Sequence, residues 1–208
     1  MRRVRITILR AQQASGCALI LLSITAAALA GDKDRPRYAV NPASSYPNHQ
    51  TQEKITVAAA PIITAEQTST AFGKVNPYAH GILPILLVIE NGTGKTLRVD
   101  LHAQLEDLDR HHVEAMPPGD VVLYQGVKKP PPIPYTSPIP RKKPKGPLNT
   151  WEIEGRAFSA KLIPPGETAS GFIYFESNFQ PGFRLVLDGI KDAATGADYF
   201  FFEIPMDK

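Results

Sequence analysis

Cysteine is almost absent from this chain of 208 residues, since the only one is Cys17. Residues 31–208 therefore have no thiol, which excludes a disulfide, a cysteine-ligated metal site and a cysteine nucleophile in that part. Residues 31–208 also have no excess of basic charge. The whole chain has 23 Lys and Arg against 20 Asp and Glu, but four arginines lie in the first ten residues, which leaves 19 against 20, or −1. We therefore do not expect nucleic acid as a partner.

Long hydrophobic runs are also missing, apart from one near the N-terminus. The four arginines are followed by an apolar run over residues 17–30 that ends in Ala28-Leu29-Ala30. This order predicts a secretory signal peptide over residues 1–30, cleaved before Gly31. A membrane-spanning helix needs about 20 apolar residues, whereas this run has fourteen. We therefore expect no transmembrane anchor after processing. The protein is then exported, to the periplasm or outside the cell.

Residues 31–53 have few large apolar side chains and no hydrophobic periodicity, and they contain three prolines. That composition predicts a flexible leader. The folded domain is expected to span residues 54–205.

Alternation of apolar and polar residues dominates that domain. Between Leu97 and Glu106 the odd positions are apolar and the even positions polar, which predicts a strand with one face on a core. Residues 82–89 are almost all apolar, as in a strand covered on both faces. Other strands are expected at 54–62, 111–116, 156–163, 171–175, 183–187 and 199–204, with Asp188-Gly189 as a turn signal.

Helical signals are few. Thr64 and Gln67 have the spacing of a capping box before a helix that ends at Gly73, and Pro117 can begin a short helix reaching about Tyr124. With no alternation of strands and helices, the pattern predicts an all-β chain. We expect an antiparallel immunoglobulin-like β-sandwich of about eight strands, with two minor helices and a long proline-rich insert.

Two segments carry a resemblance to a known family. Residues 89–97 read as strand, Asn-Gly turn and strand, and residues 162–172 place Pro165-Gly166 before Gly171 and an aromatic strand. These hairpins resemble exported bacterial immunoglobulin-like (telokin-like) β-sandwich domains. The resemblance implies a sandwich fold and an envelope or extracellular setting. It transfers no catalytic residue, because such domains are usually not enzymes.

Several short motifs resemble known functional sites. Gly92-Thr93-Gly94-Lys95-Thr96 resembles the end of a phosphate-binding loop, but an alternating strand follows it in place of the required helix. The sequence predicts a hairpin turn there. Asn91-Gly92-Thr93 also fits a glycosylation sequon. The sequence has no serine nucleophile elbow. With no motif of this kind supported, we predict no catalytic residue and no cofactor.

Histidines and acids gather between His102 and Glu114. Adjacent His111 and His112 on a strand point to opposite faces, and a zinc site needs three or four converging donors. We find two at best, such as His112 with Glu114, and predict no metal site. A metal-dependent or carbohydrate-active enzyme with its site near residues 102–114 stays open as an alternative function.

The segment 128–147 differs from the rest of the chain. It has eight prolines, six cations and no acid, which leaves a charge of −7 on the remainder of residues 31–208. Such a segment favours an extended polyproline conformation. We predict it as a basic proline-rich loop that contacts a partner through Lys128, Lys129, Tyr135, Arg141, Lys142, Lys143 and Lys145. A merely solvated insert is the alternative.

Together these features predict an exported, non-catalytic binding or envelope-structural module. Its loop would contact an anionic component of the cell envelope or a protein partner. A third alternative is an assembly factor that adds a strand to a partner, for which an exposed, unpaired edge strand would be the signature.

Overall fold

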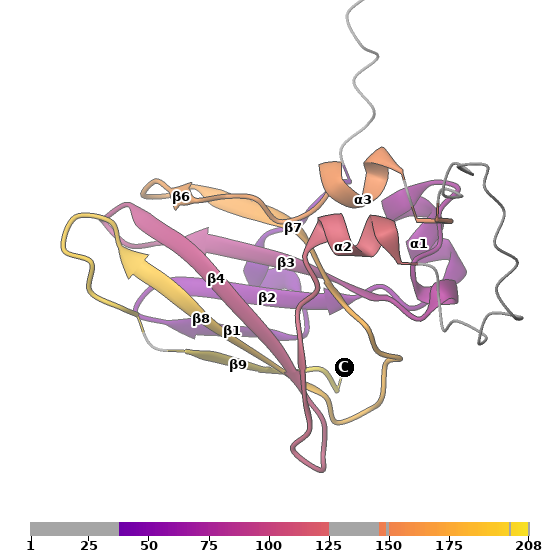
Figure 1. Cartoon of the computed structure of the whole chain (residues 1–208). Helices are drawn as coiled ribbons and strands as arrows, with labels where there is room; N and C mark the ends of the chain where they lie inside the picture. The colour runs from indigo at the N-terminus through magenta and orange to yellow at the C-terminus, as the bar shows by residue number, and fades with distance from the viewer. Residues whose placement is uncertain (1–37, 125–145, 149, 200, 208) are drawn as a thin grey trace, which may run out of the picture. The chain divides into compact units, whose positions relative to one another are not determined.

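Strands make up most of the computed structural model, which describes residues 38–124, 146–148, 150–199 and 201–207 (Figure 1). The predicted signal peptide and the loop residues named above lie outside these residues. In the described part, no helix is long and apolar enough to cross a membrane.

Within the described residues, nine strands form two antiparallel sheets. The first sheet has the order β1 (His49–Gln52), β2 (Ile55–Pro61), β3 (Leu83–Asn91) and β7 (Thr168–Phe175). The second has the order β5 (His112–Glu114), β4 (Leu97–Glu106), β8 (Arg184–Asp192) and β9 (Phe202–Pro205), and β6 (Leu162–Ile163) also pairs with β4. The predicted all-β sandwich is thus confirmed. Its orders β2-β3-β7 and β4-β8-β9 follow strands A-B-E and C-F-G of the immunoglobulin topology.

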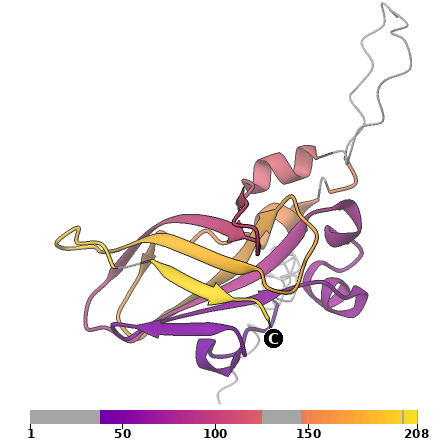
Figure 2. The same ribbon diagram turned by 90° about the horizontal axis from the view of Figure 1, so that it is seen from below.

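Short helices gather at one end of the sandwich (Figures 1 and 2). They are α1 (Ala65–Phe72), α2 (Pro118–Leu123) and α3 (Trp151–Gly155), with 3₁₀ turns η1 (Ala43–Ser45) and η2 (Tyr78–His80). The predicted capping box of α1 is present, because the Thr64 side chain accepts from the N–H of Gln67 and the Gln67 side chain accepts from the N–H of Thr64. Gly73 follows as the C-cap, with φ of 67°.

Two hydrophobic cores lie on opposite faces of the first sheet. One fills the space between the sheets and includes Ile85, Leu87, Leu105, Leu187 and Phe202. The other lies under the helices and includes Phe72, Val121 and Ile153. The ring of Phe72 packs against those of Phe172 and Tyr174 of β7. Strand β3 contributes to both, which confirms the prediction that this strand is covered on both faces.

Three predicted boundaries are wrong. The folded unit begins at Tyr38, and residues 49–52, assigned to the leader, form β1 against β2. Strand β8 continues through Asp188 and Gly189 to Asp192. Of residues 156–163 only Leu162 and Ile163 form a strand, in which Leu162 is exposed and Ile163 is buried.

A β-bulge explains why the turn signal at Gly189 misled. Between Val99 and His102 the register of β4 on β8 shifts by one residue, so Asp100 and Leu101 lie opposite Gly189. Gly189 has φ of 88°, and a Cβ built on it would collide with the carbonyl oxygen of Asp100. A positive φ favours glycine in a turn and equally at this position in β8, where the Asp100 carbonyl also leaves no room for a Cβ.

Candidate functional site

The anchors of the basic loop are described even though the loop is not. Tyr124 precedes the undescribed residues 125–145 and Gly146 follows them. A Cβ built on Gly146 would lie 3.0 Å from the carbonyl oxygen of Tyr124 and 3.2 Å from that of Val122. The chain therefore leaves and re-enters the folded unit at one place.

That place is held rigidly by the second core. Val121 of α2, Leu148 and Ile153 of α3 are fully buried. The hydroxyl of Tyr174, a buried residue of β7, donates a 2.8 Å hydrogen bond to the carbonyl oxygen of Ile153, and its burial raises its pKa well above the ordinary value. The two helices that flank the loop are thus attached to the first sheet.

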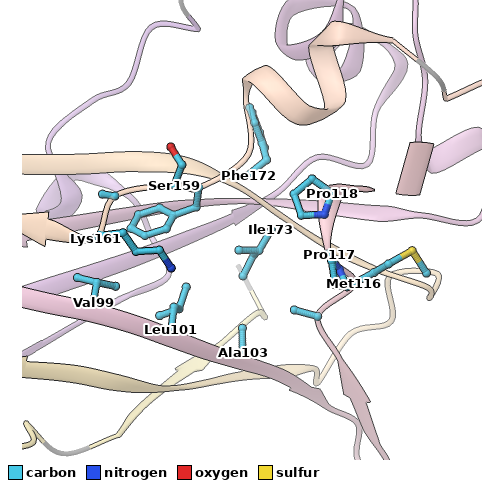
Figure 3. A pocket seen from close by; sticks show the side chains of 13 residues that line it. Val99, Leu101, Ala103, Met116, Pro117, Pro118, Ser159, Lys161, Phe172 and Ile173 are labelled. Carbon is cyan, nitrogen blue, oxygen red and sulfur yellow. The ribbon is translucent and has the colours of Figure 1, made fainter. Parts of the chain in front are cut away.

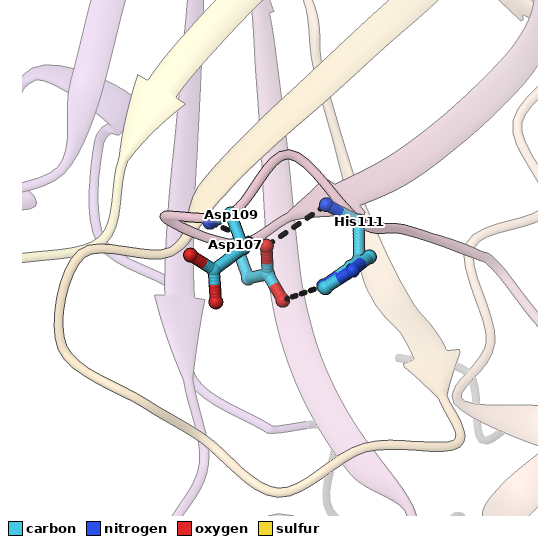
Figure 4. Close-up of side chains that lie close together, drawn as sticks. All are labelled: Asp107, Asp109 and His111. Atoms are coloured by element: carbon cyan, nitrogen blue, oxygen red, sulfur yellow. Dashed lines mark hydrogen bonds and ion pairs between the residues drawn. The ribbon is translucent and has the colours of Figure 1, made fainter.

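The hairpin between β4 and β5 brings three potential metal ligands together (Figure 4). Single donor atoms of Asp107, Asp109 and His111 all lie within 4.8 Å of one another. This trio was not predicted from the sequence. His112 and Glu114, the pair that the sequence suggested, are not part of it, and Nδ1 of His102 instead lies 2.9 Å from Oδ1 of Asp188 across the sheet.

Hydrogen bonds of the turn account for the position of Asp107. Its Oδ1 accepts from the N–H groups of Asp109 at 2.8 Å and His111 at 2.9 Å, and its Oδ2 lies 2.9 Å from Nδ1 of His111. The bonds from His111 lower the pKa of Asp107, and the side-chain bond to Asp107 raises the pKa of His111. Both carboxylate oxygens therefore already close the hairpin, so a metal ion would have to compete with these bonds.

Asn91 is a structural centre. Its side chain is buried, with Nδ2 donating to the carbonyl oxygens of Lys95, Ile163 and Pro164 at 2.8 to 3.0 Å. Its Oδ1 accepts from Thr93. The two hairpins on which the family resemblance was based thus meet at this residue. The segment 92–96 is a turn and not a phosphate loop, and the sequon asparagine lies inside the fold.

The described strand edges are partly occupied. On one side of the sandwich, Gln50 Oε1 of the short polar strand β1 accepts a 2.8 Å hydrogen bond from the N–H of Glu203 in β9. On the other side, Phe158 and Met116 donate from their N–H groups to carbonyl oxygens of β7, namely those of Phe172 and Tyr174. Polar residues and occupied edges both disfavour pairing with another chain.

A pocket of about 230 Å³ opens between the two sheets, beside β4 (Figure 3). Of its thirteen lining residues, eleven are apolar and the other two are Ser159 and Lys161. Val99, Leu101 and Ala103 of β4 form one wall, and Phe172 and Ile173 of β7 contribute another. This pocket was not predicted from the sequence, because its lining residues come from four separate segments that only the fold brings together.

Comparisons with known proteins add little. The chain matches no family model, and no curated protein matches it. Among solved structures, a crystal structure provisionally named the ApaA protein, from Bordetella pertussis, has a TM-score of 0.31 to this chain at 12% sequence identity. The alignment covers 78% of this chain and 98% of that one. A similarity at this level carries no argument about function.

Proposed function

We propose that this chain is an exported, non-catalytic β-sandwich module that captures a partner through its basic proline-rich segment. The observation that carries the proposal is the junction at Gly146, which holds both ends of the segment at one place on a packed helix pair. Loops that bind partners are commonly positioned by such a rigid scaffold.

The charge distribution supports the same proposal. Residues 128–147 contain six cations and no acid, while the rest of residues 31–208 has a charge of −7. A cationic segment on an acidic body favours an anionic partner, such as an acidic polymer or lipid headgroup of the cell envelope or an acidic protein face. Export, argued from the residues before Gly31, would bring the loop to that partner.

Salt-dependent fractionation tests the proposal. Replacing Arg141, Lys142, Lys143 and Lys145 with alanine should release the protein from the envelope fraction at lower salt than the wild type requires. A variant that exchanges Lys and Arg at the same four positions keeps the charge and should fractionate as the wild type does. If the alanine variant remains in the envelope fraction at every salt concentration that retains the wild type, the proposal is wrong.

A metal-dependent or carbohydrate-active enzyme is the second candidate function. The convergence of Asp107, Asp109 and His111 favours a metal, since three donors are the minimum for such a centre. Elemental analysis of the purified protein before and after the substitution Asp107→Asn tests it. Stoichiometric metal that the substitution removes would support a metal site, whereas no metal bound by the wild type would leave the hydrogen-bonded turn as the full explanation.

A further inference from the structure

The pocket beside β4 exists because the edge of that strand is covered only at its two ends. Strand β5 pairs with residues 104–106, and β6 pairs with Leu97 and Arg98. Two hydrogen bonds of 2.9 Å close the ends of the gap. The N–H of Ala115 donates to the carbonyl oxygen of Ala103, and the N–H of Val99 donates to that of Lys161. The opening lies between these bonds, at the bulge.

Small side chains leave the space empty. Ala103, Ala115 and Ala160 lie on three different segments around the pocket, where larger residues would fill it. The remaining apolar lining includes Met116 and Phe158, and no acidic side chain is among the lining residues. At about 230 Å³, the pocket is smaller than the 300–1,000 Å³ typical of sites for drug-sized ligands. It suits a small apolar group.

Lys161 is the charged residue of the pocket. In Figure 3 its side chain runs along the pocket with the nitrogen toward Leu101 and Ile173. Lys95, which precedes β4, and Lys191 of β8 form ion pairs with Asp192 and Asp198, whereas no ion pair to Lys161 is present among the described residues. An ammonium group beside apolar walls, with no carboxylate among the described residues that line the pocket, is complementary to an anionic ligand.

We propose that this pocket binds a small carboxylate with an apolar body, such as a medium-chain fatty acid, and that Lys161 pairs with the carboxylate. The carboxylate lies at the Lys161 nitrogen, near Leu101 and Ile173, and the apolar body extends along the pocket toward Ala103 and Met116. The gap in the β4 edge spans too few residues for a partner strand, since β5 and β6 block its extension in both directions. This inference does not depend on the basic loop.

Octanoate and octanol are matched probes, because they share an apolar chain and differ in charge. Methyl NMR on the full chain should show octanoate shifting the signals of Ala103, Ala115, Ala160 and Met116 at saturable concentrations. Lys161→Met should weaken octanoate binding about tenfold, or about 1.4 kcal/mol, and leave octanol binding within about twofold. Lys161→Arg should retain octanoate binding, and Lys74→Met, at an exposed lysine outside the pocket, should change neither.

Filling the pocket gives an independent check. Ala160→Leu should abolish the binding of both probes, and a retained amide spectrum shows that the variant is folded. The proposal is overturned if octanoate shifts none of the four methyl signals, or if Lys161→Met and Lys74→Met affect octanoate equally. The alanine variant of the four loop cations should bind octanoate normally, so a failure of this proposal and a failure of the loop proposal give different results.

Discussion

Asn91 shows how one buried polar residue can connect two hairpins. Its amide reaches the carbonyl oxygens of Lys95, Ile163 and Pro164, and its backbone exchanges hydrogen bonds with Gly166 and Glu167. Asn91→Ala should lower the free energy of unfolding by about 2–4 kcal/mol, because it leaves one buried and two part-buried carbonyl groups without this donor. Urea denaturation measures the loss. The control Asn178→Ala, at an exposed position, should stay within about 0.5 kcal/mol of the wild type, and equal effects of the two changes would contradict the role of Asn91.

Asp192 gives the fold a defined dependence on pH. Its buried carboxylate accepts a 2.6 Å bond from Lys95 Nζ and further bonds from the N–H groups of Ala194 and Thr195, which lower its pKa from 3.8 to about 2. A lowered pKa stabilises the folded state above the unfolded value, and this contribution is lost as the pH falls from about 4 to 2. The stability gap between wild type and Asp192→Asn should therefore be constant above pH 5.

Below pH 5 the difference in stability between the wild type and Asp192→Asn should narrow, and it should close near pH 2 as Asp192 becomes protonated. Denaturant midpoints of both proteins from pH 7 to pH 2 measure this difference. Arg98→Met, which removes an exposed ion pair with Asp100, serves as the control. A gap between wild type and Asp192→Asn that does not change with pH would show that the charge of Asp192 does not stabilise the fold.

At the scale of elements, periodicity within a strand was readable and pairing between strands was not. The alternation of Leu97 to Leu105 gave the correct inward face of β4, and the apolar run of β3 gave its two-sided burial. In β8, however, the buried side switches from Leu185 and Leu187 to Ile190 and Asp192. That switch depends on the extra residue in β4, so β8 alone could not reveal it.

Gly189 is the residue that permits this switch. Gly189→Ala should lower the free energy of unfolding by about 3 kcal/mol, since the new methyl group meets the Asp100 carbonyl and φ stays positive. Gly94→Ala is the matched control, because no atom lies within 4 Å of a Cβ built there. Thermal and urea unfolding measure both variants. Similar small losses in both would mean that the bulge relaxes without cost.

The candidate sites were harder to predict than the fold. The basic loop was visible in composition, since eight prolines and six cations need no partner to be recognised. The pocket was not, because Val99, Ala115, Phe158 and Ile173 become neighbours only when β4 and β7 face each other across the sandwich. Asp107 and His111 lie where one predicted strand ends and the next begins, but their contact depends on side-chain geometry that the sequence pattern does not show.

At the scale of the whole molecule, the sequence prediction differs from the structure at the N-terminal boundary of the folded domain. Residues 38–53 have no hydrophobic periodicity, yet Ala43 is fully buried and the ring of Tyr38 lies 5.6 Å from that of Phe172. Strand β1 pairs along the edge of β2, and the N–H of Ala59 donates to the carbonyl oxygen of Asn48. These contacts hold the segment in the fold although its own residues are mostly polar.

Two truncations decide where the domain begins. A variant lacking residues 1–37 keeps the whole folded unit and should melt cooperatively. A variant lacking residues 1–53 also loses β1, which exposes the apolar edge strand β2, and its melting temperature should be lower by at least about 10 °C, with a tendency to aggregate. Circular dichroism and size-exclusion chromatography of both variants at equal concentration measure the difference. Equal melting temperatures would mean that residues 38–53 contribute nothing to the stability of the fold.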